Sequence, residues 1–184
     1  MSRIAVIAIL LNLVALPATA QSHQPYAGLQ SRAIKALSDD QLRDLKAGRG
    51  MGLALAAELN GYPGPMHVLE LAERIDLTAE QRARVQDLFA TMKAEAIVLG
   101  DKLIAQESEL DRQFATRSIT PASLSAATAA IAATQGALRE THLKYHLVTV
   151  AILSQEQVGR YSELRGYSAG GQHHPPGGHQ RRSH

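Results

Sequence analysis

The sequence predicts an all-α protein, built as a long antiparallel helical hairpin with shorter helices packed at its open end. Apolar residues recur at steps of three and four along two extended segments, which is the spacing of a buried helix face. Serine or threonine residues suited to helix capping open four of the predicted helices. No segment shows the alternating pattern typical of a strand, and aromatic residues make up only 4% of the chain.

Residues 1–20 have the pattern of a secretory signal peptide. Arg3 forms a short basic region, residues 4–16 are an apolar run, and Ala18-Thr19-Ala20 is an A-x-A cleavage site. The alternative is a membrane anchor, but the apolar run is shorter than the roughly 20 residues that a spanning helix needs. We therefore expect export, cleavage after Ala20 and no membrane span afterwards.

Composition limits the chemistry of the exported chain. Loss of Arg3 leaves 18 Lys and Arg against 17 Asp and Glu, a balance that does not favour nucleic-acid binding. The chain has no cysteine, so it forms no disulfide. Any metal site must therefore use imidazole, carboxylate or thioether ligands.

The predicted helical domain covers residues 38–167 and follows an N-terminal arm, residues 21–37, that we expect to order only by packing. Ser38 caps the first helix, Gln41 completes a capping box and Gly48 ends the helix. The next residues, GRGMG, contain glycines like those of a dinucleotide-binding loop. Such a loop follows a strand, however, and the residues before it are helical in pattern.

Two helices are expected next. Pro65 begins the first, which turns back near Asp76, and Thr78 with Gln81 forms the capping box of a long helix that runs to about Ala115. The apolar stripe of this long helix consists of Val85, Leu88, Met92, Ala96, Leu99, Leu103, Leu110 and Phe114.

A second long helix matches the first. Thr120 caps it and Pro121 occupies its first turn, and its stripe repeats every seven residues as Leu124, Ile131, Leu138, Tyr145 and Ile152. Ser154 and Gln157 then repeat the capping box to begin a final short helix. Residues 168–184 are rich in Gly, Pro and His and predict a disordered tail. Because the hairpin leaves one face uncovered, we expect a homodimer.

Two similar elements, LTAEQ at residues 77–81 and LSQEQ at residues 153–157, open two of these helices. An LTxxQ motif at paired helix starts resembles the Spy/CpxP family of bacterial periplasmic proteins, over residues 65–166. Ser154 stands where the motif has threonine. The resemblance implies periplasmic localisation and a cradle-shaped dimer that acts as an ATP-independent chaperone or stress regulator. Among the family's members, ZraP binds zinc and CnrX senses nickel and cobalt.

A metal site is predicted from four residues. His142 and His146 are four residues apart, and they lie roughly 40° and 80° from the stripe centre at Leu138, so both face the partner helix or its margin. If the helix beginning at Pro65 folds back, His67 and Glu70 reach the same level. This nitrogen and oxygen ligand set suits zinc, nickel, cobalt or copper.

The resemblance to CnrX is partial. CnrX has paired histidines, a carboxylate and a His-x3-Met pair, whereas this chain has His146 in place of that methionine and a single histidine, His67, beside Glu70. The sequence therefore does not decide which metal binds or whether any of several further residues are ligands. These residues are Met51, Met66, Met92, Glu95, His173, His174, His179 and His184. The alternative is that His142 and His146 are packing residues.

Two functions remain after catalysis is considered. Leu143 stands where a zinc protease of the HExxH type needs its glutamate, and no nucleophile with an oriented base is discernible, so we expect no enzyme. The first function is sensing or buffering of a transition metal in an envelope metal or stress response. The second is an ATP-independent chaperone with structural histidines. The expected partners are a second copy, unfolded client proteins or an envelope signalling protein.

Overall fold

The computed structural model describes residues 25–167, and this part of the chain is all-helical, as predicted. The predicted signal peptide and the tail lie outside the described residues. The elements are a 3-10 turn, Leu29–Ser31, and the helices α1 (Asp39–Lys46), α2 (Leu55–Glu58), α3 (Pro65–Glu70), α4 (Ala79–Ala115), α5 (Pro121–Val150) and α6 (Gln155–Leu164).

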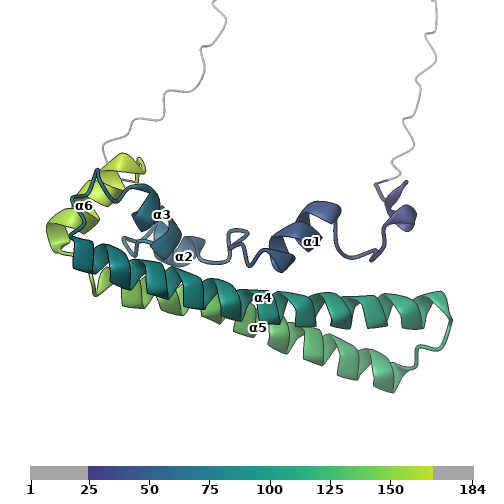
Figure 1. The fold of residues 1–184 in the computed structure, drawn as a ribbon. Coiled ribbons are helices and arrows are strands. Elements are labelled where there is room, and N and C mark those ends of the chain that lie inside the picture. Colours follow the sequence, from purple (N-terminus) through teal and green to yellow (C-terminus); the bar gives the residue numbers. More distant parts are fainter. Residues whose placement is uncertain (1–24, 168–184) are drawn as a thin grey trace, which may run out of the picture.

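The two long helices organise the fold. α4 and α5, of 37 and 30 residues, run side by side and are joined by the turn at residues 116–120 (Figure 1). Helices α1, α2 and α3 lie along one side of this pair, and α6 packs at the end remote from the turn. None of the helices between residues 25 and 167 combines the length and apolar character that a membrane span requires.

All three predicted capping boxes, and the predicted cap of α5, are present. At α1, α4, α5 and α6 the side-chain oxygen of the N-cap residue accepts a hydrogen bond from the backbone N–H three residues later, and the side chain at that position accepts one in return. The N-cap residues are Ser38, Thr78, Thr120 and Ser154. Short-range sequence signals therefore set where these helices begin.

The two LTxxQ elements also bind each other. Gln81 Nε2 donates to Gln157 Oε1 and Gln157 Nε2 donates to Gln81 Oε1, both at 2.9 Å. Each amide nitrogen also reaches a backbone carbonyl beside the other motif, that of Ile152 for Gln81 and that of Asp76 for Gln157. The paired amides thus join the starts of α4 and α6.

The helix that begins at Pro65 is shorter than predicted. The sequence predicted a helix that turns back near Asp76. α3 ends at Glu70, and residues 71–76 continue as hydrogen-bonded turns. These turns end at Asp76, whose φ of 51° is left-handed, and the Leu77 N–H then bonds the Ala72 carbonyl. Burial of Ala72 and Ile75 holds this tighter path against α4.

Two apolar clusters form the core. The larger joins the N-terminal arm and α1 to the middle of the long pair: Ile34, Leu37, Leu45, Ala96, Leu103, Ile131 and Leu138. The smaller lies at the α6 end: Val68, Ile75, Val85 and Tyr161. The described part of the arm therefore packs, through Ile34 and Leu37, against α1 and the long pair.

Burial is uneven along the predicted stripes. No residue between 104 and 130 is buried, and Phe114 and Leu124, both predicted stripe positions, are 54% and 38% exposed. The N-terminal arm reaches this part of α4 through Lys35, which pairs with Asp111 at 3.2 Å, but Phe114 and Leu124 still face solvent.

Candidate functional site

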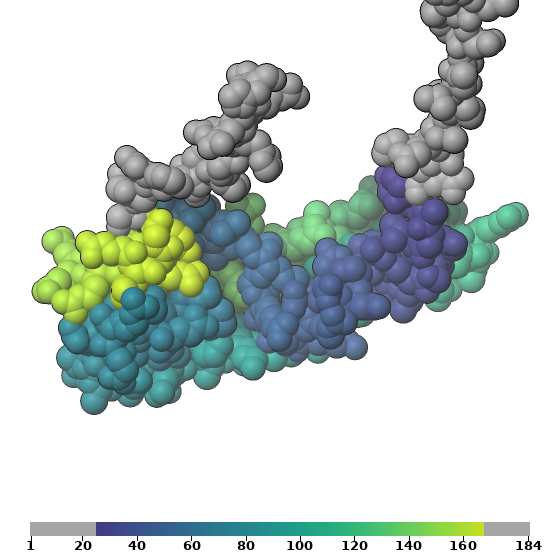
Figure 2. All heavy atoms as spheres, turned by 90° about the horizontal axis from the view of Figure 1, so that it is seen from above, coloured from purple at the N-terminus to yellow at the C-terminus, as the bar shows by residue number. Residues whose placement is uncertain are grey.

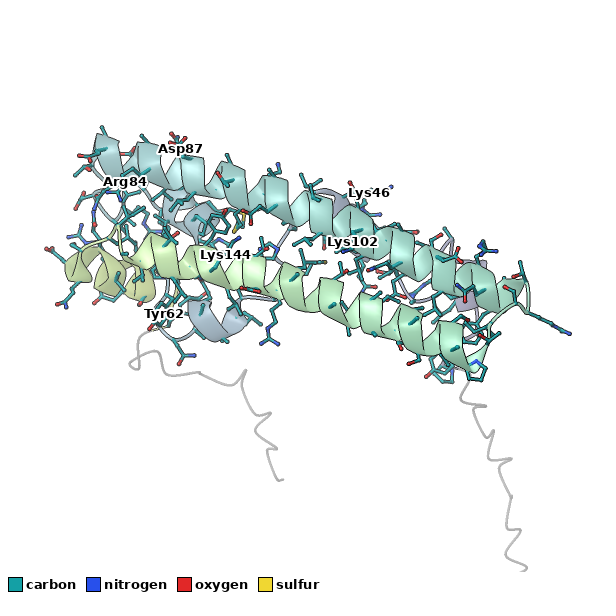
Figure 3. The ribbon with its side chains drawn as sticks, turned by 90° about the horizontal axis from the view of Figure 1, so that it is seen from below. Lys46, Tyr62, Arg84, Asp87, Lys102 and Lys144 are labelled. Atoms are coloured by element: carbon teal, nitrogen blue, oxygen red, sulfur yellow. The ribbon has the colours of Figure 1, made fainter. Side chains whose placement is uncertain are left out.

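One cavity gathers the residues of interest. It has a volume of about 560 Å³ and lies between the long pair and the segment that connects α1 to α3. In Figure 2, residues 45–60 are blue, and they lie on the face seen there, between α6 and the purple residues that follow residue 24. Seen from the other side of the molecule, Tyr62 and Lys144 mark the half of the pair that is remote from the turn (Figure 3).

Every histidine and methionine among residues 25–167 lines this cavity. They are His67, His142, His146, Met51, Met66 and Met92, and the remaining histidines and Met1 lie outside the described residues. Three of the four predicted ligands are thus brought to one place. The fourth, Glu70, does not line the cavity.

His146 has a fixed tautomer. The residue is 7% exposed, and its Nδ1 lies 2.6 Å from the carbonyl oxygen of Tyr62. Because a carbonyl oxygen only accepts, Nδ1 carries the proton in the neutral ring. The lone pair is therefore on Nε2, the state in which a histidine can bind a metal ion.

His142 carries a buried polar atom without a partner. The side chain is 3% exposed, and its Nε2 makes no hydrogen bond to any residue that the structure describes. Burial lowers the pKa of His142, and the nearby His146 lowers it further, so the neutral ring is favoured. A buried nitrogen of this kind is a candidate ligand atom.

His67 is oriented by the predicted fourth ligand. Its Nδ1 lies 2.8 Å from Glu70 Oε2 on the next turn of α3. A carboxylate that holds one imidazole nitrogen in this way commonly leaves the other nitrogen for a metal. The structure therefore places Glu70 behind His67.

Glu95, which the sequence left open as a ligand, is engaged elsewhere. It accepts a hydrogen bond from the Tyr145 hydroxyl at 2.9 Å and pairs with Lys144 at 2.6 Å. The hydrogen bond from Lys144 lowers the pKa of Glu95 most, and Glu95 does not line the cavity. These contacts fix the register of α4 against α5.

Sequence reasoning missed Glu58, which closes one end of the cavity. It is 6% exposed and accepts hydrogen bonds from the Tyr161 hydroxyl and, at 3.2 Å, from the Gly64 N–H. Arg165 Nε and His146 Nδ1 lie 3.6 and 3.7 Å from its oxygens. The signal available was a single acid in the apolar run LALAAELNGY, which predicts a buried and partnered carboxylate.

Two glycines of the connecting segment lie near the histidines, and the close approach at Gly64 requires glycine. A Cβ on Gly64 would lie 2.8 Å from Cε1 and 2.9 Å from Nε2 of His146, which is closer than real atoms approach. A Cβ on Gly50 would lie 3.7 Å from Nδ1 of His142, an ordinary contact. The segment from Gly50 to Gly64 therefore covers both rings.

The cavity does not offer a complete nitrogen and oxygen site. Within residues 25–167, no three residues of the types His, Cys, Asp and Glu converge closely enough to hold an ion by themselves. Charged groups in the wall are Asp44, Arg49, Glu58, Lys93 and Arg165. Asp44 is paired with Arg49 at 2.8 Å, so neither carboxylate of the wall lacks a partner.

Comparison with known protein families, with characterised proteins and with solved structures finds no significant match to this chain. The function is therefore inferred from the residues of the site.

Proposed function

We propose that this protein is a non-enzymatic, metal-binding helical protein of the bacterial periplasm, of the Spy/CpxP type, that senses or buffers a transition metal. The observation that supports it most is the buried, unpartnered Nε2 of His142, in the same cavity as His146 and His67. Leaving a buried polar atom without a hydrogen bond costs stability unless a further group binds there.

The histidines have the chemistry that this proposal requires. Nδ1 of His146 is bonded to a carbonyl, and Nδ1 of His67 is bonded to a carboxylate. These bonds leave Nε2 of each ring as the atom that can bind a metal. His142 is kept neutral by its burial. Bound metal would link α3 to α5, and such a link stabilises the folded state by mass action.

The family assignment, the helical hairpin and the homodimer belong to the same proposal. The mutual amide bonds of Gln81 and Gln157 support it, since they give the two LTxxQ motifs a shared structural role. The exposed side chains of Phe114 and Leu124 offer apolar area that a second copy could cover. An envelope signalling protein is the proposed partner of a sensor.

Calorimetric titration of the chain from Gln21 with zinc, nickel, cobalt and copper tests the proposal. Two full-length variants make the comparison: His142→Gln/His146→Gln, and a variant with alanine at the tail histidines His173, His174, His179 and His184. We expect binding near one ion per chain that the tail variant keeps and the double variant loses. Equal binding by all three proteins, or none by any, would refute a site at these histidines.

A chaperone function is the second candidate, and the exposed rim of the cavity favours it. Five apolar side chains of residues 51–66 are 39–56% exposed: Met51, Leu55, Leu59, Tyr62 and Met66. Of these, Met51, Leu55 and Met66 line the cavity. Contiguous exposed apolar residues are typical of surfaces that bind other proteins. Suppression of aggregation of an unfolded protein, unchanged in His142→Gln/His146→Gln and lost in Leu55→Ser/Leu59→Ser, would favour this function.

A further inference from the structure

We infer that the ion this cavity selects is soft and singly charged, copper(I), and that methionine thioethers complete its coordination beside the histidines. This inference rests on the proposed metal-binding function and names its ligand class. Copper(I) is bound preferentially by sulfur, and imidazole is an accepted second ligand type.

The first support is what the nitrogen and oxygen donors lack. The imidazoles and carboxylates of the described residues do not assemble a site of three such groups. Zinc sites in proteins are built from such donors when cysteine is absent. An ion held at His142 and His146 must then find its remaining ligand among other atom types, and the cavity offers thioethers.

The second support is the placement of the methionines. Met51 follows Gly50, where an added Cβ would lie 3.7 Å from Nδ1 of His142, and Met66 lies two residues after Gly64, where an added Cβ would lie 2.9 Å from Nε2 of His146. Both methionines line the cavity. Met51 holds a left-handed φ of 44°, a backbone conformation that a non-glycine residue rarely adopts. The chain thus has a thioether at a position that glycine would occupy more easily.

Met92 supplies a thioether from the third side. Glu95 contacts Lys144 and Tyr145, so in an antiparallel pair a residue three positions before Glu95 lies level with residues 147–148, next to His146. Met92 is 6% exposed and lines the cavity from α4. Sulfur is therefore available from α4 and from both ends of the connecting segment.

The third support is the charge of the wall. The cavity presents three permanent cations, Arg49, Lys93 and Arg165, against the carboxylates of Asp44 and Glu58. Both carboxylates are already paired, with Arg49 and with Arg165. A net positive wall repels a doubly charged ion more than a singly charged one, while neutral imidazole and thioether ligands suit the latter.

Competition of the metal-free chain from Gln21 with the copper(I)–bicinchoninate complex, beside zinc titration, tests the inference. Met92→Leu removes the buried sulfur and nearly conserves volume, so the fold should persist. We expect it to weaken copper(I) binding by about tenfold or more, since even the hydrogen-bond partners of metal ligands change affinity by 10–100-fold. Zinc binding, if present, should not change. Phe89→Leu, which alters the same wall without removing sulfur, is the matched control and should behave as wild type.

Silver(I), a diamagnetic probe of the same charge and softness, gives a second readout. Its addition should shift the methyl signals of methionine in the wild-type protein, and the signal assigned by its loss in Met92→Leu should be among those that move. Zinc binding that depends on His142, with copper(I) no tighter and the methionine signals unmoved, would overturn the inference and leave the proposed function standing. Absence of binding by every metal would overturn both.

Discussion

Tyr161 on α6 donates a hydrogen bond to Glu58 at the end of α2, across 103 positions of sequence, and both side chains are buried. Burial raises the pKa of Tyr161, and the bond to Glu58 raises it further, so the hydroxyl stays protonated and keeps donating. The pair therefore fixes the connecting segment to the C-terminal helix.

Tyr161→Phe should destabilise the fold by about 1.5–3 kcal/mol, because a buried carboxylate then loses a donor. Urea unfolding followed by circular dichroism measures this. Tyr145→Phe is the matched control, since the Tyr145 hydroxyl donates to Glu95, whose side chain is 39% exposed. There water can replace the donor, and the expected cost is below about 1 kcal/mol. Equal costs for the two variants would contradict the role given to Glu58.

The amide pair of Gln81 and Gln157 predicts energetic coupling between the two LTxxQ motifs. In a double-mutant cycle with alanine, the two substitutions should deviate from additivity by about 0.5–3 kcal/mol, because each removes the same mutual bonds. Gln41 provides the control, since it completes the same type of capping box in α1. Gln41→Ala combined with Gln157→Ala should be additive, and coupling of that pair as well would discredit the specific link.

Gly64→Ala should displace the ring of His146. The added methyl would lie 2.8 Å from the ring, which is held on its other side by the Tyr62 carbonyl, so we expect a loss of about 1–3 kcal/mol of stability. Gly50→Ala, with its contact at 3.7 Å from His142, should be close to neutral. Urea unfolding and the ring-proton NMR signals of His146 distinguish the two. A disturbance of His146 by Gly50→Ala alone would mean that the segment lies differently.

The lowered pKa of His142 predicts a pH dependence of the metal-free protein. The unfolded chain binds a proton near the ordinary pKa of about 6.5, and the folded chain binds it only at lower pH. Stability is therefore full above about pH 7 and falls as the pH drops below 6.5, until the folded pKa is passed. The other ionisable groups around the cavity are Asp44, Arg49, Glu58, His67, Lys93, His146, Arg165 and Tyr167.

His142→Gln should flatten this dependence between pH 7 and pH 5, as measured by urea unfolding in the presence of a chelator. The free energy of unfolding is plotted against pH for both proteins. The difference between the two slopes gives the contribution of His142, because the other ionisable groups are common to both. An identical slope in the two proteins would show that His142 is as easily protonated in the folded chain as in the unfolded one.

Much of the fold follows from local sequence. Helix starts depend on signals that act within one helical turn, and they can therefore be predicted without knowledge of the tertiary structure. These signals are the capping boxes at Ser38, Thr78 and Ser154 and the prolines Pro65 and Pro121. The early end of α3 was not predicted, because burial of Ala72 and Ile75 against distant residues decides it.

The site was predictable only in part, for the same reason. The spacing of His142 and His146 places them on one helix face, and His67 also reaches the cavity. The outward position of Glu70, the burial of Glu58 and the cover provided by Gly50 and Gly64 all depend on contacts between segments far apart in the chain. Periodicity carries no information on such contacts.

Because burial is uneven along the long pair, one end of the pair is held by more contacts than the other. One end is clamped by the Gln81–Gln157 amides and by the smaller core cluster, and the cavity lies in that half. Beyond Leu103, α4 continues for about 18 Å with no buried residue, at 1.5 Å per residue, and the arm contacts this stretch at its surface, through the pair of Lys35 with Asp111. A small change of the angle between the helices at the clamped end would therefore move the other end, where Phe114 and Leu124 face solvent, over a larger distance.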